Sequence, residues 1–366
     1  MPKNSKPVIC FFNSTKAWGG GEKWHYDMAV CLFEKQFSIN FAANKKSELA
    51  QRLKKHNIPL TTFTIGNLSF LNIFKLLQLK RFFERKKISV VVMNLPSDIK
   101  AAGIAAKWAG VSRIVYRRGS AVPIKNSFLN RFLFKYILTD VIANSEATKN
   151  TILERNPGLF PKEKIKVIYN GLNFSETVKA GTQNFYSPLP GETVIGNVGR
   201  MVYQKGHNYL LEIASRLKSE GINFKMILGG SGPLETEIKT MAQRLGLNDR
   251  VIFTGFVDDV PWFMHNIDIF LLTSRWEGFG FVLAEAMAAA KPIVAFDISS
   301  NPELVKHGSN GFLARPFDTV EFANYLITLI KNQKLRNDFG KKGHEIVREK
   351  FSFDRVVKEF LEMVTV

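Results

Sequence analysis

Two carboxylates separated by a glycine turn dominate the stretch from Ser274 to Ala288. Glu277 opens the turn Glu277-Gly278-Phe279-Gly280, and Glu285 lies in the Ala- and Leu-rich segment behind it. Eight residues of helix rise about 12 Å, whereas two carboxylates that act together as acid and nucleophile on one sugar bond lie roughly 5 Å apart. Glu277 and Glu285 are therefore expected to hold two parts of one long ligand. Carboxylates accept hydrogen bonds from vicinal hydroxyls, so a ribose and a second sugar fit; the alternative is a capped helix with a solvated Glu285.

The elements around this turn predict an anion site. The apolar run Asp268 to Leu272 is typical of a buried parallel strand, and the segment from Phe281 to Ala290 has a helical composition. Glycines 278 and 280 let the backbone approach a ligand closely. The unpaired N–H groups and the dipole at the start of the following helix favour a negative charge, usually a phosphate.

A second loop in the same half of the chain carries two cations. The sequence Gly199-Arg200-Met201-Val202-Tyr203-Gln204-Lys205-Gly206 follows an apolar strand, and open α/β sheets bind ligands at the carboxyl ends of their strands. Arg200 and Lys205 suit a diphosphate leaving group because they neutralise charge as it develops. The alternative, two exposed bases at a helix start, is disfavoured because the helix dipole repels cations there.

These motifs resemble those of the family 4 retaining glycosyltransferases of GT-B fold. The pair Glu277 and Glu285 matches the family's E-x7-E signature, and Arg200 to Gly206 matches its R-x4-K-G pattern. The resemblance implies an α/β fold of two Rossmann-like domains facing each other across a cleft, with a C-terminal helix crossing back to the N-terminal domain. It implies catalytic roles for Arg200, Lys205 and Glu277, with the latter at the donor sugar and Glu285 at the nucleotide ribose. The other donor-binding residues that it implies in this half are Gly199, Gly232, Phe256, Val257, Gly278, Phe279 and Gly280.

The N-terminal half has its own glycine loop after its first strand. Three glycines precede a helix that begins near Glu22, and the resemblance implies that Gly20 and Gly21 approach the donor phosphates and that Glu22 lies near the acceptor. Many family members place a His at the end of a middle strand, where this chain has Arg117 and Arg118. Arginine stays protonated and cannot be a general base. The two arginines are candidates for binding an anionic acceptor, and a surface role for Arg118 stays open.

No metal or cofactor is expected. The chain contains no Asp-x-Asp motif, and Asp258 and Asp259 are adjacent, which places them poorly for sharing one ion. The cations and the helix N-terminus can supply the electrostatic stabilisation that a metal would otherwise give. The nucleotide sugar is therefore expected to act as a substrate, without a metal ion.

Length and charge divide the chain. Its 366 residues exceed one ordinary domain. Residues 1–172 contain 29 Lys and Arg against 10 Asp and Glu, a net of +19, whereas residues 173–366 contain 22 of each. An asymmetry this complete favours an anionic partner for the first half.

Strand and turn patterns give the domain boundaries. We expect an acceptor-binding domain over 1–172 with a returning helix over 351–366, a linker over 173–190, and a donor-binding domain over 191–350. Apolar runs alternate with helical patterns in both halves, which predicts parallel sheets. Cys10 and Cys31 lack metal-ligand spacing and are expected to be reduced cysteines of a cytoplasmic protein.

Two basic helical stretches, 69–87 and 126–138, carry several phenylalanines each. Considered alone, the phenylalanines of each stretch are expected to be buried in the core. Considered together with the positive charge of residues 1–172, the two stretches favour peripheral contact with an anionic membrane, at the inner face of the cytoplasmic membrane. The expected acceptor is a lipid-linked or phosphorylated envelope glycan of the lipopolysaccharide type. The alternatives are a transferase acting on a small anionic acceptor in solution and, from another class, a basic nucleic-acid-binding protein; the motifs favour no nucleic-acid partner.

Overall fold

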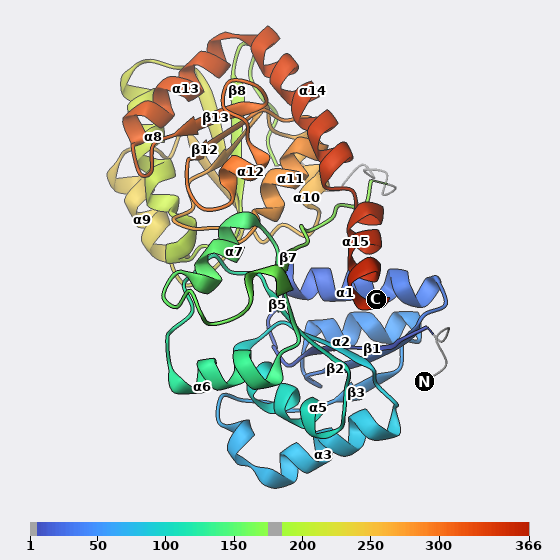
Figure 1. Cartoon of the computed structure of the whole chain (residues 1–366). Coiled ribbons are helices and arrows are strands. Elements are labelled where there is room, and N and C mark those ends of the chain that lie inside the picture. The colour runs from blue at the N-terminus through green and yellow to red at the C-terminus, as the bar shows by residue number, and fades with distance from the viewer. Residues whose placement is uncertain (1–5, 175–184, 366) are drawn as a thin grey trace. The chain divides into compact units, whose positions relative to one another are not determined.

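The chain folds into two α/β units. The computed structural model describes residues 6–174 and 185–365 (Figure 1). Unit 1 comprises the residues up to Gly171 together with those from Asp354 onward, and unit 2 runs from Leu172 to Phe353. The boundaries expected at 172 and 351 lie close to these divisions, and the part 175–184 of the expected linker lies outside the described residues.

Unit 1 is built on a seven-stranded parallel sheet in the order β3-β2-β1-β4-β5-β6-β7. Its strands are β1 (Val8–Asn13), β2 (Ser38–Ala43), β3 (Leu60–Thr62), β4 (Val90–Met93), β5 (Arg113–Arg118), β6 (Asp140–Ala143) and β7 (Ile165–Val167). Strand β1 pairs with β2 on one side and with β4 on the other. Helices cover both faces, which is why these strands appear in the sequence as continuous apolar runs.

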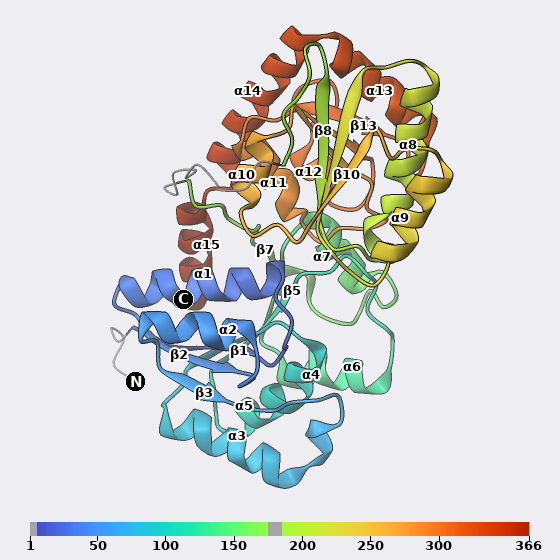
Figure 2. The same ribbon diagram turned by 180° about the vertical axis from the view of Figure 1, so that it is seen from behind.

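The helices of unit 1 divide between the two faces of its sheet. Figures 1 and 2 show α1 and α2 on one side and α3 and α5 on the other. The helices are α1 (Gly20–Glu34), α2 (Glu48–Leu53), α3 (Ile73–Arg85), α4 (Pro96–Asp98), α5 (Ile104–Trp108), α6 (Phe128–Phe132), α7 (Glu146–Leu153) and α15 (Phe353–Thr365). Short 3-10 helices are η1 (Lys54–His56), η2 (Ser69–Leu71) and η5 (Lys162–Lys164), and π-helical turns are η3 (Ile99–Gly103) and η4 (Leu133–Ile137).

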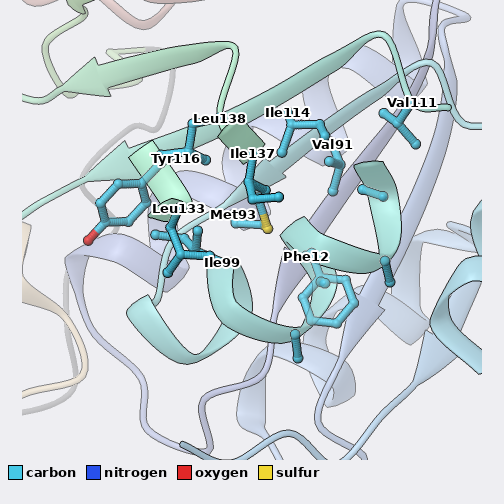
Figure 3. Close-up of a cluster of buried hydrophobic side chains, with 14 of the residues drawn as sticks. Phe12, Val91, Met93, Ile99, Val111, Ile114, Tyr116, Leu133, Ile137 and Leu138 are labelled. Carbon is cyan, nitrogen blue, oxygen red and sulfur yellow. The ribbon is translucent and has the colours of Figure 1, made fainter. Parts of the chain in front are cut away.

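Each face of this sheet has its own apolar core. On one face, side chains of β1, β4 and β5 such as Phe12, Met93 and Ile114 meet Ile99 of η3 and Leu133 of η4 (Figure 3). On the other face the rings are aromatic: Phe11 of β1 stacks on Phe41 of β2 and on Phe360 of α15, with centroids 6.0 Å apart in both pairs. Helix α15 thus belongs to the core of unit 1 although it follows unit 2 in the chain.

Unit 2 repeats this architecture with six parallel strands in the order β10-β9-β8-β11-β12-β13. The strands are β8 (Thr193–Val198), β9 (Phe224–Gly229), β10 (Val251–Gly255), β11 (Ile269–Leu272), β12 (Ile293–Phe296) and β13 (Gly311–Ala314). The helices are α8 (His207–Ser219), α9 (Glu235–Arg244), α10 (Val260–His265), α11 (Phe281–Ala288), α12 (Asn301–Leu304), α13 (Thr319–Lys331) and α14 (Gln333–Lys350), with the 3-10 turn η6 (Tyr203–Lys205). A core of Leu, Ile and Phe side chains joins α8, α9 and α13 to one face of the sheet.

Several sequence expectations need correction at this level. The edge strand β13 was not expected, because Gly311 begins it directly after a turn sequence. The aromatic stripes are core only in part: Phe82, Phe83 and Phe134 are buried, but Phe74 and Phe128 are 81% and 86% exposed. Cys10 is buried and Cys31 half-buried, and both are free thiols. Among the described residues, no helix has the length and apolar character needed to span a bilayer.

Candidate functional site

The candidate site of unit 2 lies where its chain connections diverge. Strands β8 and β11 are neighbours, but β8 leads through α8 to β9 on one side, and β11 leads through α11 to β12 on the other. The loops that leave the carboxyl ends of two such strands separate, and open α/β sheets bind ligands in the crevice between them. These loops contain the sequences 199–206 and 273–280, which hold the predicted cations and carboxylate.

The two loops are joined by a buried ion pair. Lys205 Nζ lies 2.6 Å from Glu277 Oε1, and the same oxygen accepts a hydrogen bond of 2.6 Å from Ser274 Oγ. The Glu277 side chain is 7% exposed and that of Lys205 is 19% exposed. A carboxylate this buried needs a paired cation, so Lys205 fixes the position of Glu277.

Backbone contacts hold the same loops in register. Arg275 N donates to Gln204 O at 2.7 Å, and Gln204 Nε2 donates to Trp276 O at 2.9 Å. The Arg275 guanidinium carbon lies 4.2 Å from the ring centroid of Tyr203 and 4.8 Å from that of Tyr209. Arg275 therefore fastens the loop after β11 to the loop after β8.

The remaining predicted residues of unit 2 differ in exposure. Arg200 is exposed, and within 6–174 and 185–365 its guanidinium has no side-chain or backbone partner. Glu285 is half-buried in α11, and Phe256 is 68% exposed beside the buried Val257. Phe279 is 2% exposed as a whole residue, and its ring packs on Phe281 and Phe351. Its side chain therefore supports the turn from within the core of unit 2.

Glycines shape this edge of the sheet by close backbone approach. Gly280 has φ +77° directly before α11, and Gly206 has φ +60° before α8. A Cβ on Gly206 would lie 2.3 Å from the Thr273 carbonyl oxygen, and one on Gly232 would lie 2.5 Å from that of Met201. Gly232 therefore lets its own backbone pack directly against the backbone of Met201. Gly199 lies beside the aliphatic part of the Lys205 side chain.

Unit 1 has a corresponding divergence between β1 and β4, and polar side chains fill it. Glu22, in the first turn of α1, is 8% exposed, and its Oε1 accepts from Asn13 Nδ2 at 3.1 Å and from Asn94 Nδ2 at 3.3 Å. Arg117 at the end of β5 donates to Asn94 Oδ1 at 3.1 Å and to Asn170 Oδ1 at 2.5 Å. These residues form a buried polar network.

Arg117 is the most deeply placed cation of this network. It is 1% exposed, and its guanidinium carbon lies 4.4 Å from the centroid of the Trp24 ring. Burial lowers its pKa to about 9, against the opposing effect of Glu22. Direct contact with an acceptor would require Arg117 to leave these partners. Arg118 is half-buried and donates to the Tyr116 hydroxyl and to the Val122 carbonyl.

The glycine loop of unit 1 packs against this network. Gly20 is exposed and Gly21 half-buried in the first turn of α1, which Gly19 precedes. A Cβ on Gly21 would lie 2.4 Å from Asn94 Nδ2. The absence of a side chain at Gly21 therefore brings α1 against the end of β4.

Three buried titratable groups lie close to these two edges. Burial raises the pKa of Asp98 to about 7, although Ser14 donates to its carboxylate from both N and Oγ. Burial lowers the pKa of His25 well below its usual value, and the nearby Arg117 adds to this. Burial and then Lys205 lower the pKa of His207 to about 4. The two imidazoles are therefore neutral near pH 7.

Sequence reasoning missed the residues that support the predicted ones. Ser274, Gln204 and Arg275 lie inside the quoted motifs. The contacts of Gln204 and Arg275 depend on a second loop about 70 positions away, whereas Ser274 contacts Glu277 within its own loop. Asn94 directly follows the apolar run of β4, so the strand-end rule that selected Arg200 selects it too. Within the described ranges, no three His, Cys, Asp or Glu side chains gather as a metal site requires.

Comparisons with known proteins agree with this architecture. Residues 18–176 match the family model described as Glycosyltransferase Family 4, and residues 182–346 match the model described as Glycosyl transferases group 1. The uncharacterized glycosyltransferase MJ1178 of Methanocaldococcus jannaschii is 30% identical over 308 residues, which is 82% of each chain. A second glycosyltransferase of that organism, MJ1607, is also 30% identical, and the match spans 60% of its length.

Two further similarities bear on the fold and on function. The Staphylococcus aureus capsular polysaccharide biosynthesis glycosyltransferase CapM is 28% identical over 90% of each chain. The crystal structure of Anabaena HepE in complex with UDP and glucose superposes with a TM-score of 0.82 at 24% identity, covering 98% of this chain and 99% of that one. The two sheets, their parallel strands and these neighbours identify the fold as GT-B. The chain belongs to the glycosyltransferase family whose two halves these models describe, and it is a glycosyltransferase.

Proposed function

We propose that this enzyme transfers a sugar from a nucleoside diphosphate sugar to a hydroxyl of an envelope glycan, with retention of the anomeric configuration. The observation that carries the donor assignment is the Lys205–Glu277 pair beside the exposed Arg200 at the divergence of β8 and β11. HepE, a protein of the same fold, has been crystallised with UDP and glucose. CapM is named for capsular polysaccharide synthesis, which supports a glycan acceptor.

The cations suit the departure of the diphosphate. The bond between the anomeric carbon and the phosphate oxygen breaks, and the acceptor oxygen forms a bond to the same face of that carbon. The acceptor proton passes to the departing phosphate oxygen. Arg200 and Lys205 oppose the negative charge that develops on the diphosphate, as does the N-terminus of α11.

Glu277 has a role that follows from its pairing. Phosphate oxygens compete for Lys205 when the donor binds, and the freed Glu277 oxygen then accepts hydrogen bonds from sugar hydroxyls. The amides of residues 278–280 lie directly behind it, and Glu285 in the next turns of α11 accepts from the ribose hydroxyls. Phe256 and Val257 lie near the base. No metal takes part, because the fixed cations supply the neutralising charge.

The acceptor is expected to be anionic or lipid-linked, since unit 1 contains nearly all of the excess positive charge. Glu22, Arg117 and Arg118 are its candidate contacts, and the first two would have to exchange internal partners for the acceptor. The enzyme would act in the cytoplasm, in peripheral contact with the membrane. A small anionic acceptor in solution is the second candidate, and the same charge supports it. Membership of a glycosyltransferase family decides against the nucleic-acid-binding alternative.

The donor assignment can be tested by calorimetry with UDP, GDP, ADP and CDP. One of them should bind wild type, and Arg200→Ala should weaken that binding or slow turnover, whereas Arg244→Ala, which removes an exposed cation of α9, should change neither. A rate that persists in EDTA and a retained product anomer by NMR are expected. Failure of every nucleoside diphosphate to bind would contradict the donor assignment. A turnover rate that is lost in EDTA and restored by Mg²⁺ or Mn²⁺ would contradict the proposal that no metal takes part.

A further inference from the structure

Unit 1 exposes a compact group of large apolar side chains at the start of α3. Leu68, Leu71, Ile73 and Phe74, here called the apolar tip, are 72%, 69%, 50% and 81% exposed. They line a hollow of about 460 Å³ together with Asn72. Single exposed apolar residues are ordinary on a protein surface, but such a cluster marks a binding surface.

The local structure holds these side chains outward. Asn72 caps α3 by accepting from Lys75 N at 3.1 Å, and Ser69 Oγ accepts from Gly66 N at 2.9 Å. Lys75 Nζ donates to the Thr64 carbonyl at 2.8 Å, which ties the helix to the preceding loop. The inward face of α3, with Leu76, Leu79 and Phe83, already fills the core. The hydrogen bonds at the start of α3 thus hold the apolar tip in its exposed position.

Charge around the apolar tip identifies the partner. Residues 64–138 contain fourteen Lys and Arg against Glu84 and Asp98 alone, and of these Arg117 and Asp98 are buried. Beyond its first turn α3 exposes Arg81 and Arg85, and Lys86 directly after the helix is exposed too. A second basic position with an exposed ring exists on α6, where Phe128 is 86% exposed and Arg131 is exposed. Figures 1 and 2 both show α6 on the same side of unit 1 as the N-terminal end of α3.

We propose that the apolar tip inserts into the interfacial region of an anionic bilayer while the basic side chains of α3 contact its lipid phosphates. An amphipathic helix with apolar side chains at one place and cations beside them binds such a surface through both. A second copy of this chain would bring the same positive charge and be repelled. A nucleic acid would pair with the cations but would leave four aliphatic and aromatic side chains without a partner.

The inference deepens the proposed function by naming the surface through which the enzyme reaches a lipid-linked acceptor, but the docking does not require that the donor assignment be right. Donor binding is measured in solution without vesicles, and vesicle binding without a donor. If vesicle binding holds while no nucleoside diphosphate binds, only the proposed function fails. If a nucleoside diphosphate binds while the chain does not bind vesicles, only the proposed docking surface is wrong.

The experiment is co-sedimentation of the full chain with vesicles of phosphatidylcholine and phosphatidylglycerol, and with vesicles of phosphatidylcholine alone. Leu71→Ser, Ile73→Ser and Phe74→Ser together should weaken binding to the anionic vesicles by about tenfold or more. The matched control is the combination of Leu189→Ser, Leu245→Ser and Val320→Ser, three exposed apolar residues of unit 2, which should bind like wild type.

A charge series separates the two contributions. Arg81→Gln, Arg85→Gln and Lys86→Gln together should lower anionic-vesicle binding by roughly a hundredfold at low salt and reduce its salt dependence. The control is Arg244→Gln, Lys334→Gln and Lys341→Gln in unit 2. Three results would each overturn the proposal. The serine variant could bind anionic vesicles as tightly as wild type does, or wild type could bind neutral vesicles as tightly as anionic ones. Wild type could also bind duplex DNA more tightly than anionic vesicles at the same salt concentration.

Discussion

At the carboxyl edge of the sheet in unit 1, Glu22 and Arg117 are 8% and 1% exposed and take their partners from within the unit. At the same edge of unit 2, Lys205 and Glu277 are paired, but Arg200 beside them is exposed. The two edges are built from the same kinds of residues after strands of the same topology. The charged groups at the edge of unit 1 are paired with other residues of that unit, whereas the edge of unit 2 leaves the Arg200 guanidinium open to a ligand.

This difference shows that the number of charges does not locate the site. Unit 1 has nearly all of the net positive charge of the chain, but at its sheet edge the charged groups support the fold. Unit 2 is nearly neutral, and we propose that its cations lie where a diphosphate binds. The proposed donor-binding cations of unit 2 are distinguished by their position at strand ends and, for Arg200, by exposure.

The largest effect is expected from Lys205→Ala. It removes the partner of Glu277, so turnover should fall by about 10²–10³ and the free energy of unfolding by about 3 kcal/mol, because a buried carboxylate loses its cation. Steady-state kinetics and urea unfolding measure the two. The control is Lys239→Ala, which breaks the exposed 2.7 Å pair with Glu235 and should cost under about 0.5 kcal/mol. Equal effects of both variants would remove the distinction between the two pairs.

Arg117→Leu tests the other side of the comparison. It leaves the side-chain oxygens of Asn94 and Asn170 without the guanidinium that donates to them, and it removes the buried cation that opposes the charge of Glu22. The unfolding free energy should therefore fall by about 3 kcal/mol. Arg113→Leu, on the same strand but partly exposed and 3.3 Å from Asp140, should cost about 1 kcal/mol or less. A stable Arg117 variant with a raised acceptor KM would show that this residue binds the acceptor.

Glu285→Ala should weaken nucleoside diphosphate binding by roughly ten- to hundredfold, because a hydrogen bond to a charged group contributes about 1.5–3 kcal/mol. The unfolding midpoint should stay the same. Glu237→Ala removes an exposed glutamate of α9 and provides the calorimetric control. An unchanged affinity in the Glu285 variant would exclude it from the site.

The smallest effect concerns the pH dependence of stability. The raised pKa of Asp98 means that the folded state keeps a proton that the unfolded chain releases, so this group lowers stability as pH rises from about 4 to 7. The lowered pKa values of His25 and His207 act in the opposite sense, and their stabilisation is lost as pH falls below about 6.5.

Asp98→Asn should therefore make stability rise more steeply between about pH 4 and 6.5 than in wild type. Urea unfolding at a series of pH values measures the slope. Asp140→Asn, a partly exposed change on a neighbouring strand, is the control. Parallel curves for wild type and the Asp98 variant would show that Asp98 does not retain its proton in the fold.

The sheets and the donor loops were predictable from sequence because their signals are local. Apolar runs mark the strands, and the glycine turns follow them directly, so both loops of unit 2 were expected at the strand ends. The ion pair itself was not expected, because Lys205 and Glu277 were assigned separate roles on a ligand. Their 2.6 Å contact joins residues 72 positions apart.

The burial of Arg117 was not predictable because it depends on partners distant in the chain. Whether Arg117 faces solvent is decided by Asn94, Asn170 and Trp24, none of which lies in its own motif. The same limit applies to α3. The helical spacing of its apolar residues predicts which face packs into the core, but it does not show whether another element of the protein covers Phe74. Burial of a long side chain is a property of the assembled sheet, and no local pattern contains it.

The aromatic layer of Phe11, Trp24 and Phe360 has a consequence for synthesis on the ribosome. Phe360 comes from α15, which is translated only after all of unit 2. While unit 2 is being made, the nascent first unit must leave Phe11 and Trp24 open to water or to a chaperone. We expect the second unit to complete its core first, and the earliest segment of the chain to become protease-resistant only when α15 emerges.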